Sequence, residues 1–310
     1  MNVASNPATS IILPTTSYNE VIEQLSSQLS EKDELIVVYD TEKDPIADSD
    51  IDSKSQVKLL EAGEPEGCSG KANAIYHGMK AAENNRIVWT DDDFHHPEDW
   101  LEELHKTCNK HGAVSELPFF IGQNPLTIIN EPTYALVMFI TYLNNQVWGG
   151  AVMFDRDQFD EETFLKELKS TVGDDVLLSE HLNSKTLRKT RRVEIDETVT
   201  EALERLARFV KHVRYHEPIQ SLILGVVSVI LAVLCISFPL YSLAGSSVLY
   251  FGIYQILGEN RLTFLFSYVS LLILPILLTY GVLKKSFVWH GRRLKYNSKL
   301  DVEILERGLN

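Results

Sequence analysis

The chain has 310 residues, enough for one large domain or one domain with an appendage. Its formal net charge is −14 and its sequence pI is near 5.1, so it has no broad basic face and we exclude nucleic acid as a partner. The three cysteines, Cys68, Cys108 and Cys235, are too widely spaced for a paired metal motif or a disulfide framework.

The first hundred residues predict alternating strands and helices. Short apolar runs are typical of strands, and apolar residues at every third or fourth position are typical of helices. In chain order, we predict a strand at 11–13, a helix over 21–29, strands at 34–39 and 57–60, a helix over 71–84 and a strand at 87–89. This alternation predicts an α/β fold with a mostly parallel sheet and helices on both faces.

Three carboxylates follow the strand at 87–89. Alternate residues of an extended chain point the same way, so Asp91 and Asp93 can converge on one cation. A hard divalent cation prefers oxygen ligands and can bring phosphate oxygens with it. A solvated acidic turn is the alternative, but the carboxyl end of a strand in an α/β sheet is where ligands bind. We read His95 and His96, which come next, as surface residues.

Further elements follow before the apolar C-terminal third. Residues 113–120 predict a strand, and the apolar stretch 127–142 lies at a membrane surface or under the sheet, broken at Glu131-Pro132. A strand at 148–154 has two glycines near its start, and an acidic helix covers 160–170. The helix at 173–183 has Asp174 and Asp175 in its first turn, where carboxylates stabilise the positive helix end. A strand at 193–195 follows.

The last third is amphipathic and then strongly apolar. Residues 199–214 predict a helix whose basic stripe contains Arg205 and Arg208, which suits either a membrane interface or a diphosphate. The segments 219–240 and 262–283 are long enough to span a bilayer, and both are uncharged. Residues 242–257 form a third span, a re-entrant hairpin or an interfacial piece. Basic flanks on both sides favour two spans, with 285–310 as a basic cytoplasmic tail.

Five segments together resemble a known family. They are IVVYD ending at Asp40, GCSGKANAIYHG, WTDDDFHHPEDWL, GDDVLLSEHL and RLARF. In this order, ahead of membrane spans, they resemble family 2-type inverting glycosyltransferases with a GT-A fold, most closely the ceramide glucosyltransferase-like branch. The resemblance covers roughly residues 10–215. It implies a catalytic domain at 1–215, including the interfacial helix 199–214, and a transmembrane region at 216–284.

The resemblance also implies roles for individual residues. Asp175 matches the catalytic base, and Asp91 and Asp93 match the DxD pair that holds Mg²⁺ or Mn²⁺. The residues that match the donor-binding positions are Asp40, Lys71, Asn73, Asp91, Arg205, Arg208 and Phe209. The family usually has Trp where this chain has Phe209, which keeps a flat apolar surface but loses the indole N–H. Positions where relatives shape the acceptor pocket are Trp148, Gly149, Gly150 and Asp174, although Trp148 and the two glycines fit a packed strand start equally well.

These roles define an expected reaction. A base near the acceptor hydroxyl takes its proton as the new bond forms, while the metal and arginines neutralise the departing diphosphate. One base without a carboxylate nucleophile implies inversion at the anomeric carbon. We expect a membrane-bound hexosyltransferase of glycolipid biosynthesis, multi-pass in the cell membrane with its catalytic domain in the cytoplasm. Its expected donor is a nucleotide sugar, most simply a UDP-sugar, and its acceptor is a lipid or lipid-linked hydroxyl.

Three alternatives stay open at this point. Polyprenyl-phosphate sugar synthases resemble the chain through the DxD region but usually lack an element like Arg205–Phe209. Processive polysaccharide synthases normally need more spans to build a channel. A catalytically inactive, membrane-anchored nucleotide-sugar-binding protein is the third, and the replacement at Phe209 leaves room for it.

Overall fold

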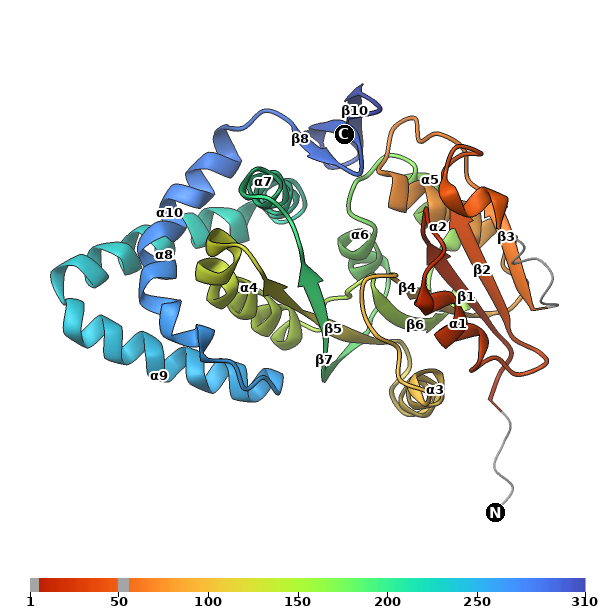
Figure 1. Cartoon of the computed structure of the whole chain (residues 1–310), viewed down its shortest axis with the longest axis horizontal. Helices are drawn as coiled ribbons and strands as arrows, with labels where there is room; N and C mark the ends of the chain where they lie inside the picture. The colour runs from red at the N-terminus through yellow and green to blue at the C-terminus, as the bar shows by residue number, and fades with distance from the viewer. Residues whose placement is uncertain (1–5, 50–55, 310) are drawn as a thin grey trace, which may run out of the picture. The chain divides into compact units, whose positions relative to one another are not determined.

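The computed structural model describes residues 6–49 and 56–309 (Figure 1). The chain divides into two compact units, each built from two stretches of sequence. The first unit contains residues 1–117 and 145–187, and the second contains residues 118–144 and 188–310. This division differs from the predicted boundary at residue 215, because residues 118–144 and 188–215 group with the apolar helices.

A seven-stranded sheet runs through the described residues, and its order is β3-β2-β1-β4-β6-β5-β7. The strands are β1 (Thr9–Pro14), β2 (Glu34–Tyr39), β3 (Val57–Glu61), β4 (Arg86–Thr90), β5 (Val114–Gly122), β6 (Ala151–Asp155) and β7 (Lys185–Ile195). Strand β1 pairs in parallel with β2 and β4, and β2 pairs in parallel with β3. Strand β6 pairs antiparallel with β4 and β5. The predicted α/β fold with a mostly parallel sheet is confirmed.

The described part of the first unit contains five α-helices. They are α1 (Glu20–Ser26), α2 (Gly70–Ala81), α3 (Trp100–His111), α5 (Glu161–Leu168) and α6 (Asp174–His181), with short 3₁₀ turns η1 (Pro45–Asp48) and η3 (Arg156–Gln158). Asn19 caps α1 and Ser69 caps α2, each by accepting a backbone N–H. Helix α2 packs closely on the sheet at Gly78, where a Cβ would lie 2.5 Å from the Ile12 side chain.

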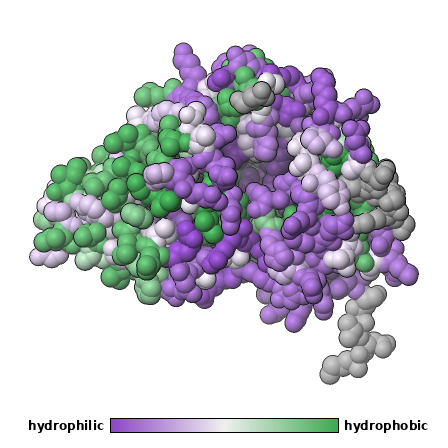
Figure 2. Space-filling view, viewed as in Figure 1, coloured by the Kyte–Doolittle hydropathy of each residue, from purple (hydrophilic) through white to green (hydrophobic). Residues whose placement is uncertain are grey.

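The second unit is mostly helical and ends in a small sheet. Its elements are α4 (Pro125–Leu143), α7 (Val199–His216), α8 (Pro218–Ser237), α9 (Pro239–Leu257), η4 (Leu262–Phe266), α10 (Ser267–Leu283), β8 (Phe287–Trp289), β9 (Arg292–Ser298) and β10 (Asp301–Glu306). Hydrophobic residues gather on the surface of α8, α9 and α10 (Figure 2). By length and composition, four segments of the described chain could cross a membrane: 125–143, 218–237, 239–257 and 262–283.

The stretch 127–142 is one continuous helix, so the predicted break at Glu131-Pro132 is wrong. Proline lacks the N–H of the helical ladder, but tertiary contacts hold this turn in place. Glu131 is fully buried and makes two hydrogen bonds of 2.9 Å to Arg261. Tyr254 of α9 donates a further hydrogen bond to Glu131. Packing around Glu131 therefore overrides the local preference of Pro132.

The structure also bears on two predictions about the C-terminal third, the interfacial helix 199–214 and the tail 285–310. The apolar stripe of α7 packs on α10, where Leu206 and Val210 cluster with Leu277. A Cβ on Gly281 of α10 would lie 2.6 Å from Val210 Cβ, so the two helices approach closely. The interfacial position of α7 was predicted from its basic stripe and stays a prediction, while α10 covers part of its apolar side. Residues 285–310 are not a simple tail, because β8, β9 and β10 form an antiparallel sheet.

Candidate active site

The acidic segment after β4 is fixed by its backbone and by its middle residue. The Asp91 N–H donates to the Gly150 carbonyl at 3.1 Å, which ties the end of β4 to the turn before β6. Asp92 accepts hydrogen bonds from Thr15 at 2.5 Å and Asn19 at 3.0 Å, so its carboxylate secures the loop after β1. The Asp92 carboxylate therefore has hydrogen-bond partners within the fold.

The cap of α2 brings a distant segment to the same place. The Ser69 N–H donates to the Thr171 carbonyl, and the Ser69 hydroxyl donates to the Val172 carbonyl, both at 3.2 Å. These bonds hold the loop before α6 against the first turn of α2. As a result, Asp174 at the start of α6 lies beside Lys71 at the start of α2.

Lys71 links two of the predicted carboxylates. Its Nζ lies 2.5 Å from Asp91 Oδ1 and 3.6 Å from Asp174 Oδ2. Burial alone would lower the pKa of Lys71, but the carboxylates of Asp174 and Asp91 raise it, so the side chain stays charged. Burial raises the pKa of Asp174 to about 6. The cluster thus holds a permanent positive charge between two acidic groups.

The side chains of this cluster leave no room for a Cβ at Gly149 or Gly150. A Cβ on Gly149 would lie 2.5 Å from Asp174 Oδ2 and 3.5 Å from Lys71 Nζ. A Cβ on Gly150 would lie 2.7 Å from Asp91 Oδ2. Because real Cβ atoms do not approach other atoms so closely, no other residue fits here without a shift. Both glycines precede β6, which begins at Ala151, later than predicted.

Asp175 and Trp148 flank the cluster. Asp175 is half-buried, lies in the first turn of α6 and accepts a hydrogen bond from the Val176 N–H at 2.8 Å. A Cβ on Gly149 would be 3.4 Å from Asp175 Cβ, so this carboxylate adjoins the glycine turn. Trp148 is 9% exposed and packs against Phe94 with ring centroids 5.4 Å apart. The Trp148 ring also packs against Gly150, where a Cβ would lie 2.3 Å from the ring. This is the packing role at the start of a strand that the sequence left open.

Asp93 is the exposed member of the acidic segment. Desolvation by surrounding protein atoms, followed by the negative charge of Asp91, raises the pKa of Asp93 to about 7. Such crowding of carboxylates favours a cation, and their oxygens are the ligands that Mg²⁺ and Mn²⁺ prefer. Among the described residues, no group of three or more acidic, His or Cys side chains forms a metal cage. A cation held by Asp91 and Asp93 together with substrate phosphates stays a prediction.

Two other predicted donor residues lie in the first unit. Asp40 follows β2 at the carboxyl edge of the parallel strands, and its N–H donates to Asp44 at 2.9 Å. Asn73 is buried, and its amide donates to the carbonyls of Ala62 at 3.2 Å and Gly63 at 2.8 Å. A donor contact by Asn73 stays a prediction that its packing does not favour, since both hydrogen bonds stabilise the loop after β3.

Arg205, Arg208 and Phe209 belong to the second unit. Arg205 forms an ion pair with Glu197 at 2.9 Å. The Arg208 guanidinium lies 4.0 Å from the ring centroid of Trp289 and 5.1 Å from that of Phe209. Arg208 therefore contacts the indole of Trp289, from β8, as well as the ring of Phe209. Sequence reasoning missed Glu197 and Trp289, because only the fold brings them to the arginines.

A family model matches a continuous stretch in the N-terminal part of the chain. Residues 10–161 match the family model described as glycosyl transferase family 2. The matched range includes Asp40, Lys71, Asp91 and Asp93 and ends before α6. No curated protein sequence matches the chain.

Two of the solved structures that match the chain do so at low identity and low TM-score. A mycobacterial protein is 14% identical, with a TM-score of 0.39, over 66% of this chain and 74% of that one. Glucosyl-3-phosphoglycerate synthase from Mycobacterium tuberculosis, in complex with Mn²⁺ and UDP-glucose, is 13% identical, with a TM-score of 0.40, over 66% of this chain and 78% of that one.

Proposed function

We propose that this chain, whose residues 10–161 match the family model described as glycosyl transferase family 2, is a glycosyltransferase that transfers a sugar from a nucleotide-sugar donor to the hydroxyl of a membrane lipid. The observation that carries this proposal is the meeting of Lys71, Asp91, Asp174 and Asp175 at the Gly149-Gly150 turn, within the first unit. Three separate segments contribute to this cluster, and each begins at the end of a strand or at the start of a helix.

The charges of the cluster suit a nucleoside diphosphate leaving group. Lys71 keeps its proton and presents a cation beside Asp91. Asp91 and Asp93 would hold a divalent cation, which supplies positive charge to the phosphate oxygens when it is bound. Asp40, which follows β2 at the carboxyl edge of the parallel strands, would contact the base or ribose of the donor. Arg205 and Arg208 would add positive charge to the departing diphosphate.

Asp175 is the proposed base. An acceptor hydroxyl must lose its proton as it attacks, and a positioned carboxylate can take that proton. No second carboxylate is assigned as a nucleophile, so we infer direct displacement with inversion. A phosphate acceptor, as used by a polyprenyl-phosphate sugar synthase, is already ionised and needs no base. The dependence of transfer on Asp175 therefore separates a hydroxyl acceptor from a phosphate acceptor.

The second unit supports a membrane location and a lipid acceptor. Large apolar side chains on α8 and α9 are strongly exposed, including Ile219 (74%), Leu240 (78%) and Val248 (73%). Exposing so many of them to water is unfavourable, whereas a bilayer would bury them. An acceptor drawn from the same bilayer explains why a glycosyltransferase domain and apolar helices share one chain. We infer a multi-pass membrane protein with its site on the cytoplasmic side.

The test is transfer by the full chain in lipid vesicles. Purified protein is incubated with Mn²⁺, a cell lipid extract and each of a panel of radiolabelled sugar nucleotides. We expect one donor to label the organic phase and EDTA to abolish the labelling. Label that reaches only water-soluble acceptors would contradict a lipid acceptor, and transfer that is unaffected by EDTA would contradict the metal role.

A further inference from the structure

The helices α8 and α9 form an uncharged hairpin in the second unit. Residues 218–258 contain no Asp, Glu, Lys or Arg. Helix α8 has 20 residues and α9 has 19, so each is about 30 Å long, the thickness of a bilayer core. The tip where the two helices meet lies apart from the other elements of the second unit (Figure 1). The hairpin is therefore long enough to cross a bilayer and return.

Both ends of this hairpin are attached to neighbouring elements of the same unit. Helix α8 begins directly after α7, and the end of α9 is bound to strand β7. Arg188 of β7 donates a hydrogen bond to the Ile256 carbonyl at 2.6 Å, and Arg192 of β7 pairs with Glu259 at 2.9 Å. Only residues 196–198 separate β7 from α7. The chain after α9 therefore returns to the side from which α8 started.

Helix α10 is also attached at both of its ends. Before its start, Arg261 donates two hydrogen bonds of 2.9 Å to the buried Glu131 of α4. After its end, Lys284 forms an ion pair with Glu204 of α7. The same carboxylate accepts a hydrogen bond from the Val288 N–H at 2.9 Å. The position of α10 is therefore tied to the positions of α4 and α7.

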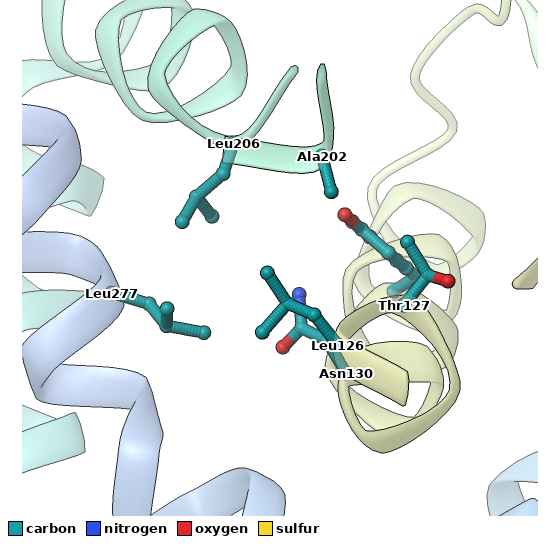
Figure 3. A pocket seen from close by; sticks show the side chains of 7 residues that line it. Leu126, Thr127, Asn130, Ala202, Leu206 and Leu277 are labelled. Carbon is teal, nitrogen blue, oxygen red and sulfur yellow. The ribbon is translucent and has the colours of Figure 1, made fainter. Parts of the chain in front are cut away.

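One side of α10 packs along these two helices. The Ser270 hydroxyl lies 2.6 Å from the Thr133 hydroxyl of α4. Figure 3 shows Leu277 of α10 pointing toward Leu206 of α7 and Leu126 of α4. Contacts near the start, in the middle and after the end of α10 therefore join it to α4 and α7.

The opposite side of α10 is an exposed apolar stripe. Val269, Ile276 and Leu283 are 39%, 68% and 74% exposed. They lie seven residues apart, which is close to two helical turns, so they share one face. Helix α8 differs, since only three of its residues are buried. A helix that is exposed and apolar on most sides suits the bilayer core, whereas an apolar stripe suits the boundary between head groups and acyl chains.

A crossing by α10 would carry α7 into the hydrocarbon of the bilayer. Helix α7 packs on α10 through Leu206 and Val210, which cluster with Leu277. Charged side chains are expensive at the centre of a bilayer. Those of α7 are Glu201, Glu204, Arg205, Arg208, Lys211 and Arg214. A position of α10 parallel to the bilayer leaves these charges on the aqueous side.

We propose that α8 and α9 cross the bilayer as a hairpin with its tip, residues 238–241, on the far side, and that α10 lies in the cytoplasmic surface of the bilayer. Val269, Ile276 and Leu283 then face the lipid. This assignment rests on the proposed function, which places the second unit at a membrane. It keeps two crossings, but α9 rather than 262–283 provides the second one.

The arrangement keeps the basic segments before α8 and after α10 in the cytoplasm, in agreement with the positive-inside rule. It also brings the proposed donor site toward the acceptor. Helix α7, which contains Arg205 and Arg208, is separated from the lipid by the thickness of α10, about 10 Å.

Cysteine labelling in intact cells tests this topology with the full-length protein. The three native cysteines are buried, and the wild type gives the background. Single cysteines replace three exposed residues: Tyr241 at the tip, Asn260 before α10 and Lys285 after it. With a membrane-impermeant maleimide, we expect Tyr241→Cys to be labelled in intact cells. Asn260→Cys and Lys285→Cys should be labelled only after permeabilisation.

Two other labelling patterns would overturn the proposal. Labelling of only one of Asn260→Cys and Lys285→Cys in intact cells would mean that α10 crosses the bilayer. A Tyr241→Cys protein that reacts neither before nor after permeabilisation would mean that the hairpin enters the bilayer without crossing it. Recovery of the wild type in the soluble fraction would instead contradict the membrane location in the proposed function.

A fluorescence measurement locates α10 itself. Purified protein carries a bimane label on Ile276→Cys in α10 or, as the matched exposed site, on Ile230→Cys in the middle of α8. The protein is placed in phosphatidylcholine vesicles whose lipids are brominated either near the head group or near the bilayer centre. We expect the label at 276 to be quenched more by the shallow bromines and the label at 230 more by the deep ones.

Equal depth of the two labels would overturn the in-plane position of α10. A label at 276 that neither lipid quenches, together with a crosslinked dimer, would mean that a second copy of the chain covers this face, and would overturn it as well.

Discussion

The Nζ of Lys71 lies 2.5 Å from Asp91 Oδ1, which joins the first turn of α2 to the acidic segment after β4. Both side chains are about one-fifth exposed, so the pair borders solvent and yet is partly desolvated. The same ammonium group lies 3.6 Å from the buried Asp174. Lys71 therefore balances two carboxylates in the fold and can also face the phosphates of a donor.

Replacing Lys71 tests this double role. Lys71→Met leaves Asp174 buried without its cation and should destabilise the protein by roughly 1–3 kcal/mol, less than for a fully buried pair. Donor affinity should also fall, because a charge that faces the diphosphate is lost. Thermal unfolding and the KM for the sugar nucleotide check both effects. Lys169→Met, which removes an exposed lysine that lies over the Tyr76 ring, should leave both near wild type.

The glycine turn provides a steric test. Gly149→Ala places a methyl group where Asp174 Oδ2 now lies within 2.5 Å, so the cluster must shift. We expect kcat/KM to fall by about a hundredfold, the effect of moving reacting groups by an ångström or so. The control is Gly245→Ala in α9, where a Cβ would meet no atom within 4 Å. Equal activity in both variants would show that the turn does not position the cluster.

Trp289 should affect the KM for the donor through its contact with Arg208. Its ring centroid lies 4.0 Å from the guanidinium, and such a contact is worth about 0.5–2 kcal/mol. We expect Trp289→Ala to raise the donor KM about threefold to tenfold, with partial recovery in Trp289→Phe. Arg293→Ala breaks an exposed pair with Glu306 in the same small sheet and should have no effect. Identical kinetics for the alanine and phenylalanine variants would contradict a contact through the ring face.

His105 predicts a dependence of stability on pH. Burial, followed by the positive charge of Arg86, lowers the pKa of His105 to about 4. Above pH 6.5 the imidazole is neutral in both folded and unfolded chains. As the pH falls from 6.5 toward 4, the unfolded chain binds a proton that the folded chain does not, so stability is lost. The loss reaches up to about 3 kcal/mol below pH 4.

The variant His105→Gln isolates this effect. The melting temperature of the wild type should fall more steeply than that of the variant between pH 7.5 and pH 5. Parallel melting curves over that range would mean that His105 is not held neutral by the fold.

The sequence was most informative where one local pattern decides the structure. Apolar runs that end in Asp40 and Asp91 are strands, and the alternation of strand and helix predicts the parallel order of β1, β2 and β4. The spacing of Asp91 and Asp93 predicts that they share a side of the chain, and the structure gives Asp92, between them, hydrogen bonds from Thr15 and Asn19. These signals depend on neighbours within a few residues.

Other features depend on residues far apart in sequence. His96, which we expected at the surface, is 1% exposed and pairs with Thr90 at 2.7 Å. Helix α4 continues through Pro132 because residues about 130 positions later hold Glu131 in place. The approach of Lys71 to Asp174 depends on the bond between Ser69 and Thr171. No local pattern predicts such contacts, since the partners carry no shared spacing or composition.

The most direct test of the central claim compares wild-type protein with Asp175→Asn in lipid vesicles. Labelled sugar nucleotide, Mn²⁺ and lipid extract are supplied, and both the organic-phase label and the donor affinity are measured. We predict labelled lipid from the wild type, a fall of about 10²- to 10⁴-fold in the variant, and unchanged donor affinity. Full transfer by Asp175→Asn would contradict the assignment of this carboxylate as the base that activates a lipid hydroxyl.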